Sequence, residues 1–291
     1  MRKDLPTRRV VLTAAASLVA STCTHALPSG GPGELKFGLT PVCLTSDLEL
    51  LAHLRSYLER FLARPVRLVT RRTYQEITAL LVSGQLDAAW ICGFPAIEYR
   101  TRLAISAVPI WRGKSLYQSY LIADRSRTAD DLDDLRGDMH AFSDPNSNSG
   151  WLVTAAELAG RGLAPQGFFR GTFFTWGHRN VVRAVTSGLA DSGSVDGYVY
   201  EVMRETEPDL VAGTRVVRRS EWLPFPPVAV AAGTAGSDMA ERLGSALRRM
   251  AEDEEGRAVL RMLRLDGFQS GDIALYDPIA AKTAAVRRFP G

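Results

Sequence analysis

Short apolar runs alternate with amphipathic segments along most of the chain. The runs at 35–39, 66–69 and 86–91 predict buried strands, and the segments between them carry apolar residues at helical spacing. The clearest helix starts at Ser46-Asp47-Leu48-Glu49, which matches a capping box. Its buried face is expected to consist of Leu50, Leu51, Leu54, Tyr57, Leu58, Phe61 and Leu62. This alternation predicts an α/β fold built on mostly parallel sheets.

The same order of strands and helices recurs in the second half of the chain. Strands are predicted at 139–142 and 173–175, and a helix at 179–187. The two halves also share a motif, Ser83-Gly84-x-x-Asp87 in the first and Ser187-Gly188-x-x-Asp191 in the second. A glycine commonly ends a helix, so the shared motif alone could be a coincidence. The repeated order of strands and helices around it favours two related lobes.

Two strand-like apolar stretches join the halves. They lie at 116–123 and 214–230 and are expected to cross from the first lobe to the second and back. The C-terminal helices, predicted at 237–264 and 280–288, would then pack on the first lobe.

The predicted architecture is an α/β clamshell of two doubly wound lobes joined by two crossover strands. Lobe I is expected to comprise 34–118 and 222–291, and lobe II 119–221. A hinged pair of lobes suits closure around a ligand.

The N-terminal segment has the pattern of an export signal. Four basic residues precede the uncharged stretch 10–21, which is too short for a membrane span. Residues 1–26 are therefore predicted to be a signal peptide for export, and no span is expected in the mature chain. Arg8-Arg9 indicates the twin-arginine route. Lipoprotein anchoring at Cys23 is less favoured because Thr22 fits the usual small-residue box poorly, and an uncleaved anchor is the other alternative.

Composition and motifs argue against several classes of function. With 46% hydrophobic residues in 291, the chain can bury the cores of two lobes, and its formal net charge is only +3. It has no basic, aromatic stripe for nucleic acid and none of the common hydrolase, metalloprotease or nucleotide-binding motifs. Its three cysteines fit neither a disulfide framework nor a zinc site. We therefore expect a binding protein rather than an enzyme, without metal or cofactor and without a nucleic-acid partner.

Polar residues gather in the loop after the strand at 139–142. Ser143-Asp144-Pro145-Asn146-Ser147-Asn148-Ser149-Gly150 opens a helix with several hydroxyls and free N–H groups, which suits a tetrahedral anion. A helix cap alone would need only one such residue. The loop as a whole is therefore a candidate anion site.

Two further candidates occupy equivalent places in the repeat. Tyr74 lies ten residues before Gly84 and His178 ten before Gly188, each at the start of a helix expected to face the cleft. Both side chains can donate hydrogen bonds to an oxyanion. Asp196 follows the strand around 194–195. It is either a helix N-cap or an acceptor for a ligand that carries a proton or an ammonium group.

Cys43 and Cys92 follow strands that are expected to be neighbours in the first sheet. Three interpretations stay open: inert buried thiols, a disulfide favoured by export, or a soft ligand for a thiophilic species.

Taken together, these residues resemble the phosphate/phosphite/phosphonate-binding proteins of ABC transporters. The resemblance runs from about Leu35 to the C-terminal helices. It rests on Tyr74, the Ser143–Gly150 loop, Gly177-His178, the two Ser-Gly-x-x-Asp motifs and Pro224-Phe225-Pro226-Pro227. It implies a type II periplasmic-binding fold and an ABC permease as partner. It also implies an oxyanion ligand surrounded by Tyr74, Ser147, Asn148, Ser149 and His178, with Asp196 in looser correspondence.

Cys92 departs from the pattern of this family. Phosphonate binders usually have an apolar-Gly-Pro stretch where this chain has Ile91-Cys92-Gly93-Phe94-Pro95. That variant is similar to a branch that senses arsenic oxyanions, in which a cleft cysteine binds arsenite and the protein informs a sensor kinase. Two functions therefore stay open: delivery to a permease, or sensing with the periplasmic domain of a histidine kinase as partner.

Overall fold

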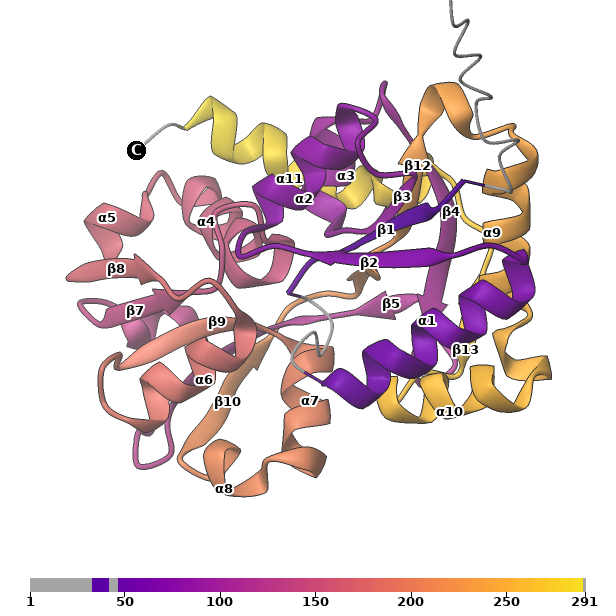
Figure 1. Ribbon diagram of the computed structural model, residues 1–291. Coiled ribbons are helices and arrows are strands. Elements are labelled where there is room, and N and C mark those ends of the chain that lie inside the picture. The colour runs from indigo at the N-terminus through magenta and orange to yellow at the C-terminus, as the bar shows by residue number, and fades with distance from the viewer. Residues whose placement is uncertain (1–32, 42–46, 290–291) are drawn as a thin grey trace, which may run out of the picture. The chain divides into compact units, whose positions relative to one another are not determined.

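The computed structural model describes residues 33–41 and 47–289. The predicted signal peptide at 1–26, with Arg8-Arg9 and Cys23, lies outside these residues, and so does Cys43. The described part belongs to one compact unit, whose strands form two large sheets and a two-stranded ladder (Figure 1). The predicted two-lobed α/β architecture is confirmed.

The first sheet has six strands in the order β13-β4-β12-β3-β1-β2. Strands β1, β2 and β3 are parallel, whereas β12 returns from the C-terminal half and pairs antiparallel between β3 and β4. The strands are β1 (Leu35–Leu39), β2 (Val66–Thr70), β3 (Ala88–Trp90), β4 (Leu103–Ile110), β12 (Val228–Ala231) and β13 (Gly267–Gln269).

The second sheet has five strands in the order β10-β6-β9-β7-β8. Strands β7, β8 and β9 are parallel to one another. Strand β6 pairs antiparallel with β9 on one side and with β10 on the other. They are β6 (Ser119–Asp124), β7 (Met139–Phe142), β8 (Gly171–Phe174), β9 (Ser192–Asp196) and β10 (Thr214–Arg219). The expectation of mostly parallel sheets therefore holds only for β2-β1-β3 and for β8-β7-β9, because β12 and β6, which follow the crossovers, pair antiparallel with both of their neighbours.

The crossovers are shorter than predicted. Only β5 (Leu116–Tyr117) and β11 (Leu223–Pro224) pair as a separate antiparallel ladder between the sheets. The rest of 116–123 belongs to β6, and 214–230 also contains β10 and most of β12. The lobe boundaries, 34–118 with 222–291 and 119–221, stay a prediction.

The helices follow the predicted spacing with two corrections. The N-cap of α1 is Asp47, not Ser46, since its carboxylate accepts the N–H of Leu50 at 3.0 Å. The expected helix at 237–264 is two helices, α9 and α10, separated by a 3₁₀ turn. In lobe I and at the C-terminus lie α1 (Leu48–Leu62), α2 (Tyr74–Val82), α3 (Gly93–Glu98), α9 (Asp238–Arg248), α10 (Glu254–Leu263) and α11 (Asp277–Arg288). In lobe II lie a π-turn (Asn148–Leu152), α4 (Val153–Gly160), α5 (Pro165–Phe168), α6 (His178–Thr186), α7 (Gly197–Thr206) and α8 (Pro208–Val211).

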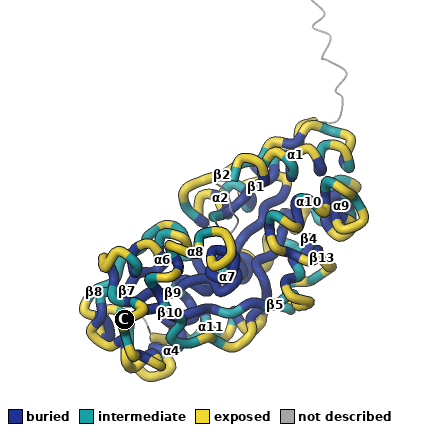
Figure 2. The backbone as a smooth tube through the Cα atoms, turned by 90° about the horizontal axis from the view of Figure 1, so that it is seen from below, coloured by how far each residue is buried: buried dark blue, intermediate teal, exposed yellow. Residues whose placement is uncertain are grey.

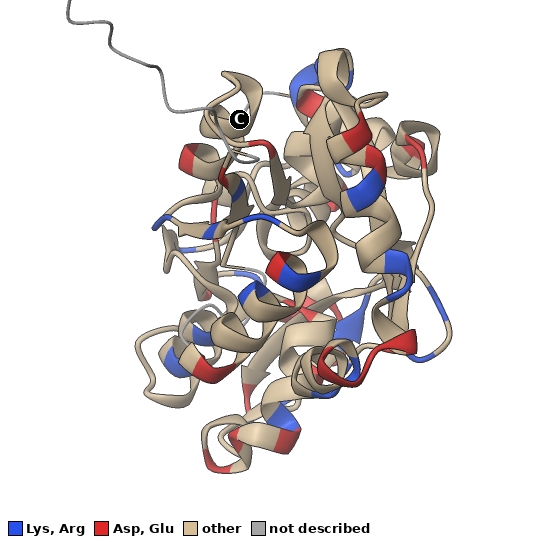
Figure 3. Ribbon diagram, turned by 45° about the vertical axis from the view of Figure 1, so that its right-hand side comes forward, with Lys and Arg blue, Asp and Glu red and all other residues tan. Residues whose placement is uncertain are grey.

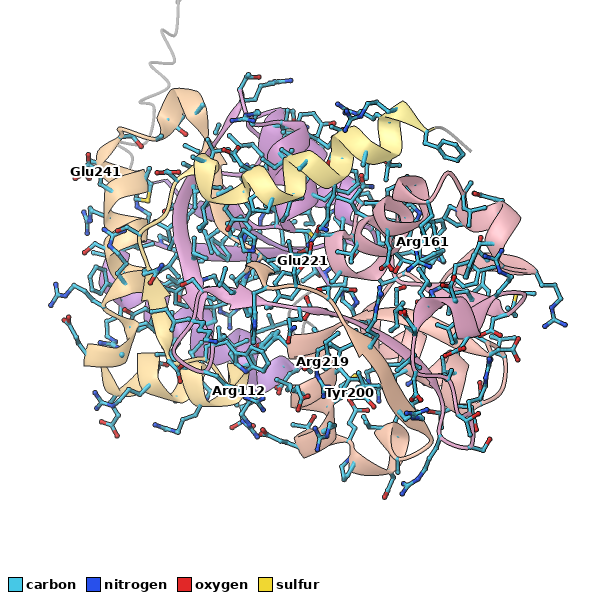
Figure 4. The ribbon with its side chains drawn as sticks, turned by 180° about the vertical axis from the view of Figure 1, so that it is seen from behind. Arg112, Arg161, Tyr200, Arg219, Glu221 and Glu241 are labelled. Carbon is cyan, nitrogen blue, oxygen red and sulfur yellow. The ribbon has the colours of Figure 1, made fainter. Side chains whose placement is uncertain are left out.

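Helix α11 does not pack on the first lobe alone, as had been expected. It contacts α3 and also α4 of the second lobe. Its Lys282 pairs with Glu221, which lies on the segment between β10 and β11 (Figure 4). The C-terminal helix therefore touches both lobes beside the crossover.

The repeated Ser-Gly-x-x-Asp motif has the same geometry in both lobes. Gly84 and Gly188 end their helices with φ of +74°, a left-handed value that favours glycine. The Asp87 carboxylate then accepts the N–H of Lys36 at 2.7 Å, and that of Asp191 accepts the N–H of Met139 at 2.8 Å. Each aspartate thus ties the turn after a helix to the start of the neighbouring strand.

Burial follows the sheets. Figure 2 shows buried backbone concentrated along the strands and exposed backbone on the outer turns of the helices. In α1, the face predicted to be buried is confirmed at Leu50, Leu54, Tyr57, Leu58 and Leu62. Among the described residues, no helix is both long and apolar enough to cross a bilayer.

Candidate functional site

The predicted site residues lie at or just before the first turns of helices. Tyr74 and His178 are the first residues of α2 and α6, and Asp196 is the N-cap of α7. Ser147 caps the π-turn that leads into α4, and Cys92 precedes α3. All five are buried. Since a helix N-terminus carries partial positive charge and free N–H groups, several such ends together favour an anion.

Tyr74 and His178 face each other across the two lobes. The Tyr74 hydroxyl lies 3.0 Å from His178 Nε2, and His178 Nδ1 accepts the backbone N–H of Asp196 at 3.1 Å. Because Nδ1 is an acceptor, the ring proton of a neutral imidazole sits on Nε2. Burial lowers the pKa of His178 to about 3, so the ring is neutral at physiological pH. His178 is therefore an uncharged donor whose N–H points to the opposite lobe.

The loop after β7 reaches back to lobe I. Asp144 accepts the N–H of Asn146 at 2.7 Å within the loop and that of Tyr74 at 3.2 Å from the other lobe. The backbone N–H of Asn148 donates to Cys92 Sγ at 3.2 Å, and its side-chain amide donates to the Tyr117 hydroxyl at 2.9 Å. These bonds bring the first turn before α4 into direct contact with the first lobe and the crossover.

Ser147 is a helix cap, the role that the sequence allowed as the alternative to anion binding. Its Oγ accepts the N–H of Gly150 at 2.9 Å. The hydroxyl can still donate its own proton, because accepting a bond does not use the O–H. Ser149 follows two residues later, with its Oγ 3.5 Å from Asp196 Oδ2.

Two polar atoms of this loop have no hydrogen-bond partner within the described residues. They are Ser143 Oγ and Asn148 Oδ1, and both residues are fully buried. Buried polar atoms normally have a hydrogen-bond partner. Two such atoms without a partner in one loop therefore mark a place where a ligand is expected. Rotation of the Asn148 amide would turn its NH₂ group to that place and let Tyr117 donate to the oxygen.

Gly150 allows the close packing of this loop. A Cβ at this position would lie 1.8 Å from Ser143 Oγ and 3.0 Å from Cε1 of His178. No side chain fits in that space. The glycine therefore lets the loop backbone, the unpaired serine and the imidazole come together.

The electrostatics of the site are unusual for an anion site. Throughout 33–41 and 47–289 no lysine or arginine is buried, and Figure 3 shows charges of both signs interspersed on helices and loops. Within the site, the carboxyl groups of Asp144 and Asp196 are buried instead. Burial raises the pKa of Asp196 to about 7 and also raises the pKa of Asp144. Among the described residues, the buried groups that can attract an anion here are neutral donors and helix N-termini.

Cys92 is a free, buried thiol. Burial raises its pKa to about 12, so the group is protonated at neutral pH. Cys43, the partner in the disulfide interpretation, lies outside the described residues. No group of three or more His, Cys, Asp or Glu side chains in the described part is arranged to hold a metal ion.

Three residues of the cluster were not singled out from the sequence: Tyr117, Ser119 and Asp144. Tyr117 comes from β5, and Ser119 Oγ donates to the carbonyl of Ser149 at 2.6 Å. The sequence could have indicated both residues. They are polar side chains in the apolar stretch 116–123, which was expected to cross between the lobes. Asp144 was part of the predicted loop, but its bond to the other lobe could not be foreseen from local pattern.

The fold is shared with solved binding proteins of low sequence identity. A binding protein component of an ABC phosphonate transporter from Pseudomonas aeruginosa superposes with a TM-score of 0.80 at 22% identity, over 88% of this chain and 87% of that one. PhnD1 from Prochlorococcus marinus, in complex with methylphosphonate, has a TM-score of 0.80 at 16% identity, over 89% and 100%. The aliphatic sulphonate binding protein SsuA from Escherichia coli has a TM-score of 0.60 at 16% identity, over 90% and 95%.

These likenesses show a type II periplasmic-binding fold. A family model described as the phosphonate, periplasmic substrate-binding protein of ABC transporters matches residues 37–276, which is most of the chain. The predicted fold and the expectation of a binding protein rather than an enzyme are therefore confirmed. This chain belongs to the periplasmic substrate-binding proteins of phosphonate ABC transporters.

Proposed function

We propose that this chain captures a small phosphorus oxyanion, namely phosphate, phosphite or a phosphonate, and delivers it to an ABC permease. One observation carries the proposal. Tyr74 and His178, from equivalent helix starts in the two lobes, meet at 3.0 Å beside a loop with two unpaired buried polar atoms. Donors from both lobes would hold one tetrahedral anion, and its binding would favour the closed arrangement.

The ligand set proposed here is Tyr74, Ser147, Asn148, Ser149, His178 and Asp196, with Tyr117 added by the geometry. The positive ends of α2, α6 and the turn before α4 supply the favourable potential that a lysine or arginine would otherwise supply. Hydrogen bonds from neutral groups recognise shape and protonation as well as charge, so this design suits discrimination among oxyanions.

Isothermal calorimetry with methylphosphonate, phosphite and phosphate tests the assignment. The double variant Ser149→Ala with His178→Ala removes one donor from the turn and one from α6, and oxyanion binding should be abolished. The matched control, Ser126→Ala with His53→Ala, makes the same changes away from the site and should bind like the wild type. Unchanged affinity of the first variant would refute the site.

A second candidate function rests on Cys92. The thiol accepts a hydrogen bond from the turn that carries the proposed ligands, so a thiophilic species in the site would meet it. The alternative is that the protein senses arsenite and signals to a histidine kinase. The protonated state of the thiol weighs against it, because metal-like ligands bind the thiolate.

A thermal-shift screen separates the two functions. The probes are phosphate, phosphite, methylphosphonate, arsenate and arsenite, with and without reductant, since a ligand that binds the folded state stabilises it by mass action. A Cys92→Ser variant that loses only an arsenite response would support sensing. A response to phosphorus oxyanions alone, retained in that variant, would support transport.

We further propose that the lobes move as 34–118 with 222–291 against 119–221. The ladder of β5 and β11 lies at both predicted boundaries, and Tyr117 within it bonds the ligand loop. The family's compartment is the periplasm. Export of this chain through a twin-arginine signal at 1–26, in preference to anchoring at Cys23, is part of the same proposal, and mass spectrometry of the mature protein tests it.

A further inference from the structure

Arg72 and Trp176 contact each other across the two lobes, and each lies two residues before a proposed ligand, Tyr74 or His178. Each is the residue before the N-cap of a helix, α2 for Arg72 and α6 for Trp176. The Arg72 guanidinium lies over the Trp176 ring, with its Cζ 6.0 Å from the ring centroid. The repeat that pairs Tyr74 with His178 therefore also pairs the residues two positions before them.

The two contacts differ in exposure. Tyr74 and His178 are 0% and 2% exposed, whereas Trp176 is 36% exposed and Arg72 also lies on the surface. The arginine and the tryptophan therefore form the solvent-facing layer of the junction, and the tyrosine and the histidine form its buried layer. A motion that separates the buried layer also separates the outer one, because α2 and α6 begin with both.

Trp176 has a backbone conformation that a bulky residue disfavours. Its φ is +60°, in the left-handed region that favours glycine. Its neighbours fix this turn. The Thr175 hydroxyl lies 3.2 and 3.0 Å from the carbonyl oxygens of Phe142 and Gly177, and the Asn180 amide donates to the Thr175 carbonyl at 3.0 Å. Strained residues that their surroundings hold in place concentrate at functional sites, which points to a role for this ring.

Arg72 lies where the electrostatics of the fold disfavour a cation. It is next to the N-terminus of α2, which carries partial positive charge. Glu76, the acidic residue of the first turn, is engaged by Thr73 in the capping box. Within the described part of the chain, the Arg72 guanidinium has neither a hydrogen bond nor an ion pair, and it contacts only the Trp176 ring. Its charge is therefore free to attract an anion when the lobes are apart.

We infer that Arg72 and Trp176, the rim pair, control how fast the oxyanion enters and leaves the site. With the lobes apart, the charge of Arg72 attracts the incoming anion. With the lobes closed, the guanidinium binds the Trp176 ring and slows release. The inference rests on the proposed function, because it assigns entry and release to residues beside the same site. Neither residue belongs to the proposed ligand set, so both act as positioning residues.

Rapid-mixing measurements with radiolabelled methylphosphonate test both roles. Trp176→Ala should release the ligand about two- to fivefold faster, as expected for a surface cation–π contact, and should capture it at the wild-type rate. Arg72→Ala should show the same faster release and also slower capture at low salt, a difference that high salt removes. The double variant should release the ligand no faster than either single variant, because both residues act through one contact.

Two controls separate the rim pair from general effects of charge and of ring removal. Arg71→Ala removes the neighbouring exposed cation, whose guanidinium bonds the Thr70 carbonyl, and should slow capture at low salt without changing release. Trp222→Ala removes an exposed tryptophan whose cation, Lys114, belongs to the same proposed lobe, and should change neither rate.

The outcomes distinguish this inference from the proposed function. Release that is unchanged in either single variant, or additive effects in the double variant, would overturn the role of the rim pair in release while the function stands. Equal acceleration of release by Arg71→Ala would overturn it too, since the effect would then be one of charge alone. Capture by Arg72→Ala at the wild-type rate in low salt would overturn the role in entry. If methylphosphonate, phosphite and phosphate all give no binding heat, the proposed function fails and the inference fails with it.

Discussion

Burial of the Asp196 carboxyl group imposes a pH-dependent cost on the folded protein. Its pKa is about 7 in the folded chain and 3.8 in an exposed aspartate. The folded state therefore binds a proton more strongly than the unfolded state does. By linkage, the protein loses stability as pH rises from about 4 to about 7, and the loss is constant above that range.

Asp196→Asn should remove that cost. The amide has no charge to desolvate, so the variant should gain stability relative to the wild type between about pH 4 and 7, reaching at most about 4 kcal/mol. Urea unfolding of the ligand-free proteins across this range measures the difference. A difference that does not vary with pH would contradict the assignment, and Asp272→Asn, the same exchange at an exposed cap, should leave the wild-type profile unchanged.

The π-turn before α4 is the element on which the site depends most closely. It places Asn148 and Ser149 against lobe I and the crossover, and its geometry requires a residue without Cβ at Gly150. π-turns are rare and occur often at functional sites, where they redirect the side chains of a helix start.

Gly150→Ala should therefore disturb the turn. The added methyl group would overlap Ser143 Oγ, so we expect a loss of about 1–3 kcal/mol in the free energy of unfolding and at least tenfold weaker methylphosphonate binding. Gly160→Ala is the matched control at the end of α4, because nothing lies within 4 Å of its added Cβ. Equal effects of the two substitutions would show that the turn geometry is not needed.

At the scale of the whole molecule, the lobes are joined at the site by hydrogen bonds from Tyr74. Its hydroxyl meets His178, and its backbone N–H meets Asp144. Helix α11 adds a second link, since it contacts α3 and α4. Tyr74 and His178, which we propose as ligands, therefore also connect the two sheets.

Tyr74→Phe should weaken binding without unfolding the chain. The phenyl ring still fills the buried space, but His178 Nε2 loses its partner, which costs about 1–3 kcal/mol in the closed state. Methylphosphonate affinity should fall about 5- to 150-fold, as measured by calorimetry. Tyr99→Phe, at a half-exposed residue, should have no effect. Wild-type affinity in Tyr74→Phe would exclude the tyrosine from closure.

The sequence alone was sufficient for the features that depend on local order. The apolar pattern predicted β1 from Leu35 to Leu39 and β7 from Met139 to Phe142 at their observed bounds. The repeat placed Tyr74 and His178 at equivalent helix starts, and strand topology put those starts at the cleft. These predictions succeed because residue propensity, helix caps and the glycines that end helices determine local structure through neighbours only a few residues away.

Only the tertiary structure decided how these pieces meet. The bond between Tyr74 and His178 spans 104 positions, and that between Cys92 and Asn148 spans 56. The direction of the crossover strands, the double contact of α11 and the entry of Tyr117 into the site also depend on packing between distant segments. The pKa of Asp196 is set in the same way, because desolvation is a property of the assembled lobes and not of the residues beside it in the chain.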